Sequence, residues 1–373
     1  MAENFKVTPW EVEGKVDYDQ LVKQFGTRHL TPQLLERLEK HSGKLHFMLR
    51  RKIFFSHRDL DWLLDRYEKG EKFVLYTGRG PSGDTHMGHL LPWVLTKWLQ
   101  DKFDAELYFQ LTDDEKFLNS GKLGMEDTHR LSYENALDVI AMGFDPKKTF
   151  MFSNQDYGKT MYNLALKTAK LTTFSTAKAV FGFDNSTNIG MVFFPAVQAA
   201  PCFLPTELKG KNTPVLIPAA IDQDPYWRIT RDAAARLGYY KPAAIHTRFL
   251  PGLQGPDAKM SSSVPDSAIF TTDTPEAARK KIMKSFSGGA ATLAEHKKHG
   301  GNPDTDTSCQ YLYQMFEEDD GKVKEIFEQY RSGALGSGEV KNMLADKVVA
   351  FLVEHQRKRE QARKNLDKFM LKD

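Results

Sequence analysis

The residues that decide the fold are 73–103, FVLYTGRGPSGDTHMGHLLPWVLTKWLQDKF. The run from Phe73 to Thr77 is short and apolar and ends at Gly78, which predicts a buried strand. A glycine-rich loop follows, and from Leu90 to Phe103 the apolar residues recur at helical spacing. A buried strand followed by a loop and a helix is typical of the start of a strand–helix–strand unit.

The same alternation continues along the chain. Because strands that alternate with helices form parallel sheets with crossover helices, we expect an α/β fold with a Rossmann-like parallel sheet. We place this catalytic domain at residues 70–264. Its further predicted strands are 107–111, 149–152, 215–220 and 245–250, and its further predicted helices are 132–142 and 226–237.

The segments on either side have a different pattern. Residues 1–69 are charged and mostly helical in pattern, with Thr31 as the cap of one helix, and are interpreted as an N-terminal extension docked on the catalytic domain. After residue 264 the strands stop, and Thr274-Pro275-Glu276 is a good helix start. Residues 265–373 are therefore predicted to be an α-helical domain. Its last helix, from about Glu339, is long enough to pack back on the catalytic domain.

Composition excludes several classes of protein. The formal net charge of +3 is too small to argue for nucleic-acid binding by itself. Cys202 and Cys309 form no CxxC pair, so neither a disulfide scaffold nor a metal site is expected. The start, MAENFKVTPW, lacks the pattern of a signal peptide, and the apolar stretch 192–205 is too short to span a bilayer. We expect a cytoplasmic protein without a membrane partner.

The glycine-rich loop invites a misleading interpretation. Gly78, Gly80 and Gly83 have the GxGxxG spacing of a dinucleotide-binding fingerprint and follow a predicted strand. Two features argue against that function. Pro81 removes one backbone donor from the loop, and the helix begins near Gly88, later than the fingerprint requires.

The better candidate is His86-Met87-Gly88-His89 at the predicted helix entrance. The N-terminus of a helix offers unpaired N–H groups that favour phosphate, and the two histidines lie near each other there. Gly88 between them lets a flat base approach the backbone closely. On this tetrapeptide alone, a pair of surface histidines at a helix cap is an equally good explanation.

A second polar motif is Lys259-Met260-Ser261-Ser262-Ser263, in a loop rich in glycine and proline. One mobile cation and several hydroxyls suit a triphosphate whose charge moves onto leaving pyrophosphate, although a flexible polar linker also fits this motif alone. Together the two motifs resemble the HIGH and KMSKS signatures of class I aminoacyl-tRNA synthetases. The departures are Met87 in place of isoleucine and Ser262 in place of the second lysine, which leaves Lys259 as the one cation of its motif.

The resemblance extends to a particular member of that class. From about residue 70 to near the C-terminus the chain is similar to the eukaryotic and archaeal type of tryptophanyl-tRNA synthetase, whereas the first 70 residues are only loosely similar. The segments that carry the similarity are 76–82 (YTGRGPS), 110–116 (QLTDDEK), 194–201 (FPAVQAAP), 221–226 (IDQDPY) and the KMSSS loop.

This resemblance implies a reaction and its partners. L-Tryptophan would be activated by ATP with Mg²⁺ and transferred to tRNA(Trp), with release of AMP and pyrophosphate, by a homodimer whose helical domain reads the anticodon. The resemblance implies that His86, His89 and Lys259 are the catalytic residues. It implies ATP contacts for Arg79, Gly80, Pro81, Ser82, Gly88, Lys116, Met260, Ser261, Ser262 and Ser263.

The resemblance also assigns the amino-acid contacts. Tyr76 and Gln110 would bind the indole nitrogen and Glu115 and Gln198 the ammonium, while Gln223 and Lys116 would bind the carboxylate. The chemistry agrees, because an indole needs a dry slot and one acceptor for its ring N–H. Alternatively, Tyr76 is a core aromatic, Gln110 and Glu115 are solvated loop residues, and Lys116 faces ATP.

Three rivals stay open. Tyrosyl-tRNA synthetase shares the fold and both motifs, but a phenol hydroxyl usually calls for an acidic partner, and the stretch 192–205 contains no acid. A nucleotidyltransferase of the same fold also uses HxGH but is usually shorter. A non-catalytic paralogue is disfavoured because His86, His89, Lys259 and Glu115 are all present.

Overall fold

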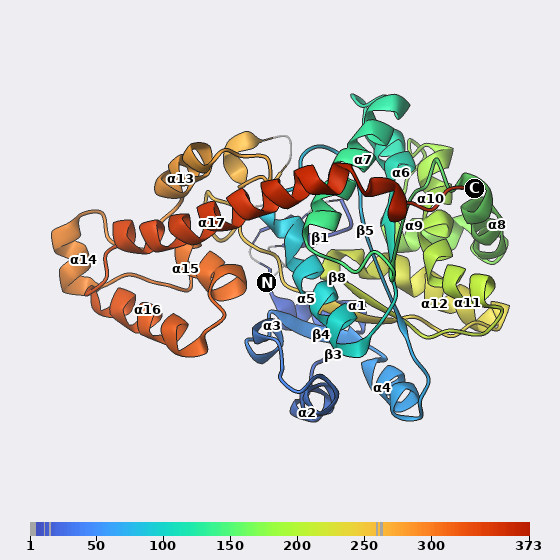
Figure 1. Cartoon of the computed structure of the whole chain (residues 1–373), viewed down its shortest axis with the longest axis horizontal. Coiled ribbons are helices and arrows are strands. Elements are labelled where there is room, and N and C mark those ends of the chain that lie inside the picture. Colours follow the sequence, from blue (N-terminus) through green and yellow to red (C-terminus); the bar gives the residue numbers. More distant parts are fainter. Residues whose placement is uncertain (1–4, 11, 15, 259, 262–263) are drawn as a thin grey trace.

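The computed structural model describes residues 5–10, 12–14, 16–258, 260–261 and 264–373, whose arrangement is shown in Figure 1. Its main strands are β3 (Arg28–His29), β4 (Phe54–Arg58), β5 (Val74–Arg79), β6 (Leu107–Leu111), β7 (Thr149–Ser153), β8 (Val215–Ala220) and β9 (Ala243–Thr247). Within the described residues they form a seven-stranded sheet of order β3-β4-β9-β8-β5-β6-β7. The pairs from β9 to β7 are parallel. The α/β prediction with a Rossmann-like parallel sheet is confirmed.

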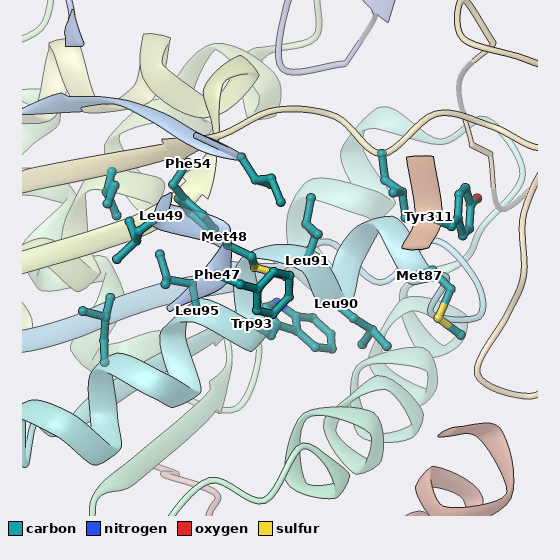
Figure 2. Close-up of a cluster of buried hydrophobic side chains, with 14 of the residues drawn as sticks. Phe47, Met48, Leu49, Phe54, Met87, Leu90, Leu91, Trp93, Leu95 and Tyr311 are labelled. Carbon is teal, nitrogen blue, oxygen red and sulfur yellow. The ribbon is translucent and has the colours of Figure 1, made fainter. Parts of the chain in front are cut away.

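Helices cover both faces of the parallel strands. Because successive side chains of a strand point to opposite faces, β5 sends Leu75 to one side and Tyr76 to the other. Leu75 belongs to the same core cluster as the apolar side chains of α5, of which Figure 2 shows Leu90 and Trp93. Tyr76 joins a second cluster that includes Trp227. The helices are α5 (Met87–Phe103), α6 (Asp113–Asn119), α7 (Met125–Ala141), α8 (Gly158–Ala169), α9 (Phe174–Phe181), α10 (Ile189–Ala199), α11 (Leu204–Lys209) and α12 (Asp224–Leu237).

Several boundaries differ from the predicted ones. The strands at 107–111 and 215–220 are confirmed, but β5 continues to Arg79 and α5 already begins at Met87. The strand predicted at 245–250 runs instead from Ala243 to Thr247, because the apolar residues after Thr247 turn into the next loop. The helix predicted from residue 132 begins at Met125, where the Asp127 carboxylate accepts a hydrogen bond from the Gly124 N–H.

The N-terminal segment is more than the predicted helical extension. Helices are present at α1 (Tyr18–Phe25), α2 (Pro32–Ser42), α3 (Phe47–Arg50) and α4 (Leu60–Glu68), and the Thr31 hydroxyl caps α2 as expected. However, β3 and β4 extend the main sheet, with β4 antiparallel to β9. A short run buried on both faces, such as β4, has no periodicity that distinguishes it from a helix segment. A small hairpin of β1 (Lys6–Val7) and β2 (Val12–Glu13) precedes these elements.

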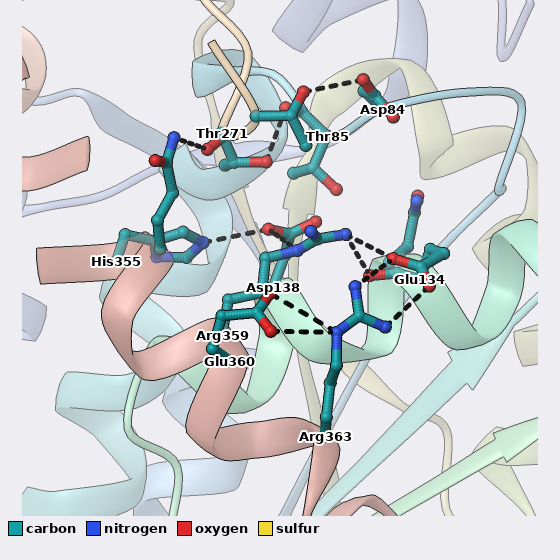
Figure 3. Close-up of polar contacts among 12 residues, drawn as sticks. Asp84, Thr85, Glu134, Asp138, Thr271, His355, Arg359, Glu360 and Arg363 are labelled. Atoms are coloured by element: carbon teal, nitrogen blue, oxygen red, sulfur yellow. Dashed lines mark hydrogen bonds and ion pairs between the residues drawn. The ribbon is translucent and has the colours of Figure 1, made fainter. Parts of the chain in front are cut away.

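The C-terminal part of the chain is helical, as predicted. It contains α13 (Pro275–Lys284), α14 (Leu293–His299), α15 (Thr307–Tyr311), α16 (Asp320–Ser332) and α17 (Ser337–Arg363). The long helix α17 runs from this helical part across to the parallel sheet (Figure 1). There His355 Nε2 lies 3.0 Å from Asp138 Oδ1 of α7, and Arg359 and Arg363 bind Glu134 (Figure 3). Among the described helices, none is both long and apolar enough to cross a bilayer.

Candidate active site

A cavity of about 1000 Å³ opens at the carboxyl ends of β5, β6 and β8. Ligands of open α/β sheets bind at these strand ends. The cavity is also lined by the start of α5, by Trp10 from the N-terminal hairpin, and by the loop that contains Met260 and Ser261. Asn302, Asp304 and Thr305 of the helical part complete the wall. The first motif and the described residues of the second, Met260 and Ser261, therefore share one space with the polar residues of the strand ends.

Tyr76 and Gln110 meet on one face of the sheet, because Gly78 of β5 stands beside Gln110 of β6 in the parallel register. The Tyr76 hydroxyl donates to Gln110 Oε1 at 2.6 Å and accepts from Gln198 Nε2 at 3.2 Å. Burial raises the pKa of Tyr76 well above its ordinary value, so the phenol stays neutral. Gln110 does not line the cavity but lies behind Tyr76, so it reaches a ligand through the Tyr76 hydroxyl.

The hydrogen-bond chain continues from Gln110, on the side away from the cavity, through two residues that sequence analysis missed. Gln110 Nε2 donates to Asn154 Oδ1 at 3.0 Å, and Asn154 Nδ2 donates to Asp114 Oδ1 at 2.7 Å. Burial raises the pKa of Asp114 to about 7, against the lowering effect of the hydrogen bond from Asn154. One signal was available, since Asn154 directly follows β7 at the same edge of the sheet where Gln110 and Asp114 lie.

Glu115 and Lys116 lie at the side of the cavity. Glu115 Oε2 and Lys116 Nζ are 2.8 Å apart, and Glu115 Oε1 accepts a hydrogen bond from the indole Nε1 of Trp10 at 3.3 Å. Trp10 was not predicted as a site residue; it packs against Phe181 at a centroid distance of 5.8 Å. A Cβ on Gly80 would lie 2.3 Å from Lys116 Cε, so a larger residue there would displace the end of the lysine side chain.

The two histidines of the first motif stack at the start of α5, with ring centroids 3.5 Å apart. His89 Nδ1 accepts from the His86 backbone N–H at 3.1 Å, so a neutral His89 carries its proton on Nε2. A Cβ on Gly88 would lie 3.2 Å from both the His86 ring and Met260 Sδ. The structure therefore places the first motif in contact with the described part of the second.

Arg79 is a buried cation at the end of β5. Its Nη1 donates to Gly80 O, but its Nε and Nη2 have no hydrogen-bond partner within the described part of the chain. Burial lowers its pKa from 12.5 to about 10, so it remains charged at neutral pH. A buried guanidinium with unused N–H groups at a cavity wall has the chemistry to bind an anion.

The remaining predicted residues fall into three groups. Ser82 and Gln223 line the cavity, whereas Pro81 is buried and is not among the lining residues. Met260 is buried near the Tyr311 hydroxyl, and the Ser261 N–H donates to Ser267 Oγ at 2.9 Å. Lys259, Ser262 and Ser263 lie outside the described residues.

Comparison with known proteins identifies the family. A family model described as tRNA synthetases class I (W and Y) matches residues 68–353. Over 371 residues the chain is 53% identical to the tryptophan–tRNA ligase of Sulfurisphaera tokodaii, covering 99% of this chain and 96% of that protein. The chain belongs to the tryptophan–tRNA ligase family. The predicted resemblance is confirmed, and as a synthetase of this family the chain uses ATP.

Solved structures agree with this placement in the tryptophan–tRNA ligases. The tryptophanyl-tRNA synthetase of Plasmodium falciparum matches with a TM-score of 0.87 and 44% identity, covering 92% of this chain and 94% of that one. The tryptophanyl-tRNA synthetase of Giardia lamblia matches with a TM-score of 0.89 and 38% identity, covering 95% and 96%. The similarity therefore spans the sheet and the helical part together.

Proposed function

We propose that this tryptophan–tRNA ligase joins L-tryptophan to ATP as tryptophanyl-adenylate, releasing pyrophosphate, and then transfers the tryptophanyl group to tRNA(Trp), releasing AMP. The hydrogen-bond partners of Tyr76 are the observation that favours tryptophan over tyrosine as the substrate. The Tyr76 hydroxyl is bonded to the amides of Gln110 and Gln198, and to no carboxylate among the described residues. A neutral acceptor suits the indole N–H, which only donates, whereas a phenol calls for an acidic partner.

The amino-acid end of the cavity supports a role for each predicted contact. The indole N–H would donate to the Tyr76 oxygen, whose proton is turned away toward Gln110. The ammonium would donate to Gln198 Oε1, which is buried and has no partner in the described residues, and to Glu115. A carboxylate can accept several hydrogen bonds, so Glu115 can receive the ammonium while it also accepts from the Trp10 indole. Gln223 and Lys116 would hold the carboxylate.

The part of the cavity at the start of α5 would bind the triphosphate of ATP and neutralise its charge. The substrate carboxylate oxygen attacks the α-phosphorus, and the bond from that phosphorus to pyrophosphate breaks. Positioning and charge stabilisation supply this kind of catalysis, with no covalent bond to the protein. His86, His89 and the N-terminus of α5 would contact the phosphates, Arg79 would add a buried charge, and Lys259 would stabilise the leaving pyrophosphate. Gly80, Ser82, Gly88 and residues 260–263 would line the ATP site.

Mg²⁺ is proposed to enter with ATP. In this role it keeps several waters and is held mostly by substrate phosphates, and it neutralises their charge when bound. The cavity fits an ion held in this way, because Arg79, Lys116 and the N-terminus of α5 would face the phosphates that carry the ion.

A homodimer is also proposed, because apolar side chains are exposed on two helices that pack together. Tyr162 and Leu166 of α8 are 56% and 44% exposed, and Ile189 at the start of α10 is 86% exposed. Exposed apolar side chains on two helices that pack together favour association with a second copy. Light scattering after size exclusion should give twice the mass of 42.5 kDa, and Ile189→Glu should shift it toward the monomer.

Three further predictions are kept as proposals. The domain boundaries at residues 69 and 264 follow from the change in sequence pattern, and the cytoplasmic location follows from the composition. The contact of the helical part with the anticodon follows from the family resemblance. Limited proteolysis tests the boundaries, and footprinting of tRNA(Trp) tests the contact.

The activation step is tested by amino-acid-dependent exchange of labelled pyrophosphate into ATP. Tryptophan should support exchange, and tyrosine should not. Exchange with tyrosine instead of tryptophan would indicate a tyrosyl-tRNA synthetase. Absence of exchange with every amino acid, in a folded sample, would refute the enzymatic proposal.

A further inference from the structure

The polar groups behind the slot form one hydrogen-bond chain in which every link points the same way. Gln198 donates to Tyr76, and Tyr76 donates to Gln110. Gln110 donates to Asn154, and Asn154 donates to Asp114. The heavy-atom distances are 3.2, 2.6, 3.0 and 2.7 Å in that order. The links join residues far apart in the sequence, so the chain is a product of the fold.

The direction is fixed at the Asp114 end. Above its pKa of about 7 the Asp114 carboxylate is ionised and only accepts hydrogen bonds, so at pH 8 Asn154 turns its NH₂ toward Asp114 and its carbonyl toward Gln110. Gln110 must then donate to Asn154, which leaves its carbonyl to accept the Tyr76 proton. With that proton committed, the Tyr76 oxygen can only accept from Gln198. Each amide has two orientations, but the terminal carboxylate leaves one consistent set.

This direction decides what the cavity offers to a ligand. It leaves an acceptor lone pair on the Tyr76 oxygen and leaves Gln198 Oε1, a buried acceptor without a partner in the described residues. Tryptophan presents two donors there, the indole N–H and the ammonium. With Gln110 reversed, the Tyr76 oxygen would accept from Gln110. Its proton would then either face the cavity and oppose the indole N–H, or bond Gln198 Oε1 and so turn the Gln198 NH₂ toward the ammonium.

We propose that Asp114 and Asn154 are positioning residues that set the donor–acceptor polarity of the tryptophan slot, so that both of its free groups accept. Neither residue is among those that line the cavity, so they act through Gln110 and Tyr76. The inference rests on the proposed contacts of Tyr76 and Gln198 with the substrate. It adds the source of their polarity, Asp114, which lies three hydrogen bonds from Tyr76.

The test replaces Asp114 by asparagine, whose amide both donates and accepts and therefore no longer imposes a direction. Pyrophosphate exchange at pH 8 is measured with tryptophan and with 3-(3-benzothienyl)alanine, in which sulfur replaces the ring N–H. We expect the ratio of kcat/KM for tryptophan over the analogue to fall about tenfold, within the range set by one unpaired buried polar group. A merely structural role lowers both values equally and leaves the ratio unchanged, which would overturn the proposal.

Matched variants separate polarity from packing. Asp113→Asn changes the neighbouring buried carboxyl, which binds Ser153 and the Gln155 N–H rather than the amide chain, and should leave the ratio unchanged. Asp114→Glu keeps an acceptor and should retain most of the ratio. If Asp114→Asn fails to fold, Asn154→Leu breaks the chain one link later and should produce the same fall.

A last variant distinguishes this inference from the proposed contacts on which it rests. Gln110→Met removes the acceptor of the Tyr76 proton directly. If Gln110→Met lowers the ratio while Asp114→Asn and Asn154→Leu do not, the slot is correctly assigned and the positioning role is wrong. If none of these variants changes the ratio, the indole contact itself is wrong.

Discussion

Replacing Gln356 by alanine should weaken the ATP side of the site while sparing the tryptophan slot. Gln356 on α17 donates from Nε2 to the backbone oxygens of Thr271 and Asp273, at 2.8 Å each. The Thr271 N–H in turn donates to Thr85 O at 2.9 Å, just before the first motif (Figure 3). Gln356 therefore stabilises the segment 271–273, which is hydrogen-bonded to Thr85 just before α5.

The expected magnitude follows from these bonds. Each contributes about 0.5–1.5 kcal/mol, so their loss costs about 1–3 kcal/mol in the placement of this segment. Since about 1.4 kcal/mol corresponds to a factor of ten, we expect kcat/KM for ATP to fall about tenfold. KM for tryptophan should change less than about twofold, because Tyr76 and Gln198 have no bond to this segment.

Pyrophosphate exchange with each substrate varied in turn measures both values. Gln361→Ala is the matched control, since Gln361 is exposed on the same helix, and it should leave both values unchanged. Equal losses for ATP and tryptophan, or no loss for either, would refute the bracing role of Gln356.

Three other outcomes follow from the structure. Tyr76→Phe removes the shared partner of two buried amides and the acceptor of the indole N–H, so KM for tryptophan should rise about tenfold or more; an unchanged KM contradicts the slot. Asp138→Ala strips the buried partner from His355 and Arg359, which should lower the free energy of unfolding by about 3–5 kcal/mol in urea titrations; a loss below about 1 kcal/mol argues against the α7–α17 network. Because the pKa of Asp114 is about 7 and the ionised form fixes the slot, KM for tryptophan should rise as the pH falls from 8 to 6, an effect that Asp114→Asn should lack and that a flat wild-type profile would contradict.

The parallel sheet could be predicted from the sequence because its strands are short apolar runs bounded by loops. The run Leu107–Leu111 is buried at every position, and the residues after it mark the carboxyl edge where Gln110 and Glu115 lie. The strand β4 could not be predicted in the same way. Its partner β9 lies far along the chain, and its charged surroundings resemble those of the helices beside it.

Site residues that lie close together in the sequence could be predicted. Pairs of residues that only the fold brings together could not. His86 and His89 occupy one helix start, so their spacing is visible in the sequence. The bond from Trp10 to Glu115 joins residues 105 positions apart, and Asn154 meets Gln110 across 44 positions. Neither pairing leaves a local pattern, because both arise only when the N-terminal hairpin and β7 reach the same sheet edge.

The most direct test of the account is charging of a tRNA(Trp) transcript with labelled tryptophan and with labelled tyrosine, compared by kcat/KM at saturating ATP. A site that hydrogen-bonds one substrate group can reject an analogue that lacks it by about 10⁴–10⁵. We predict a preference for tryptophan of that order. Comparable charging with tyrosine, or no charging by an enzyme that forms the adenylate, would contradict the account.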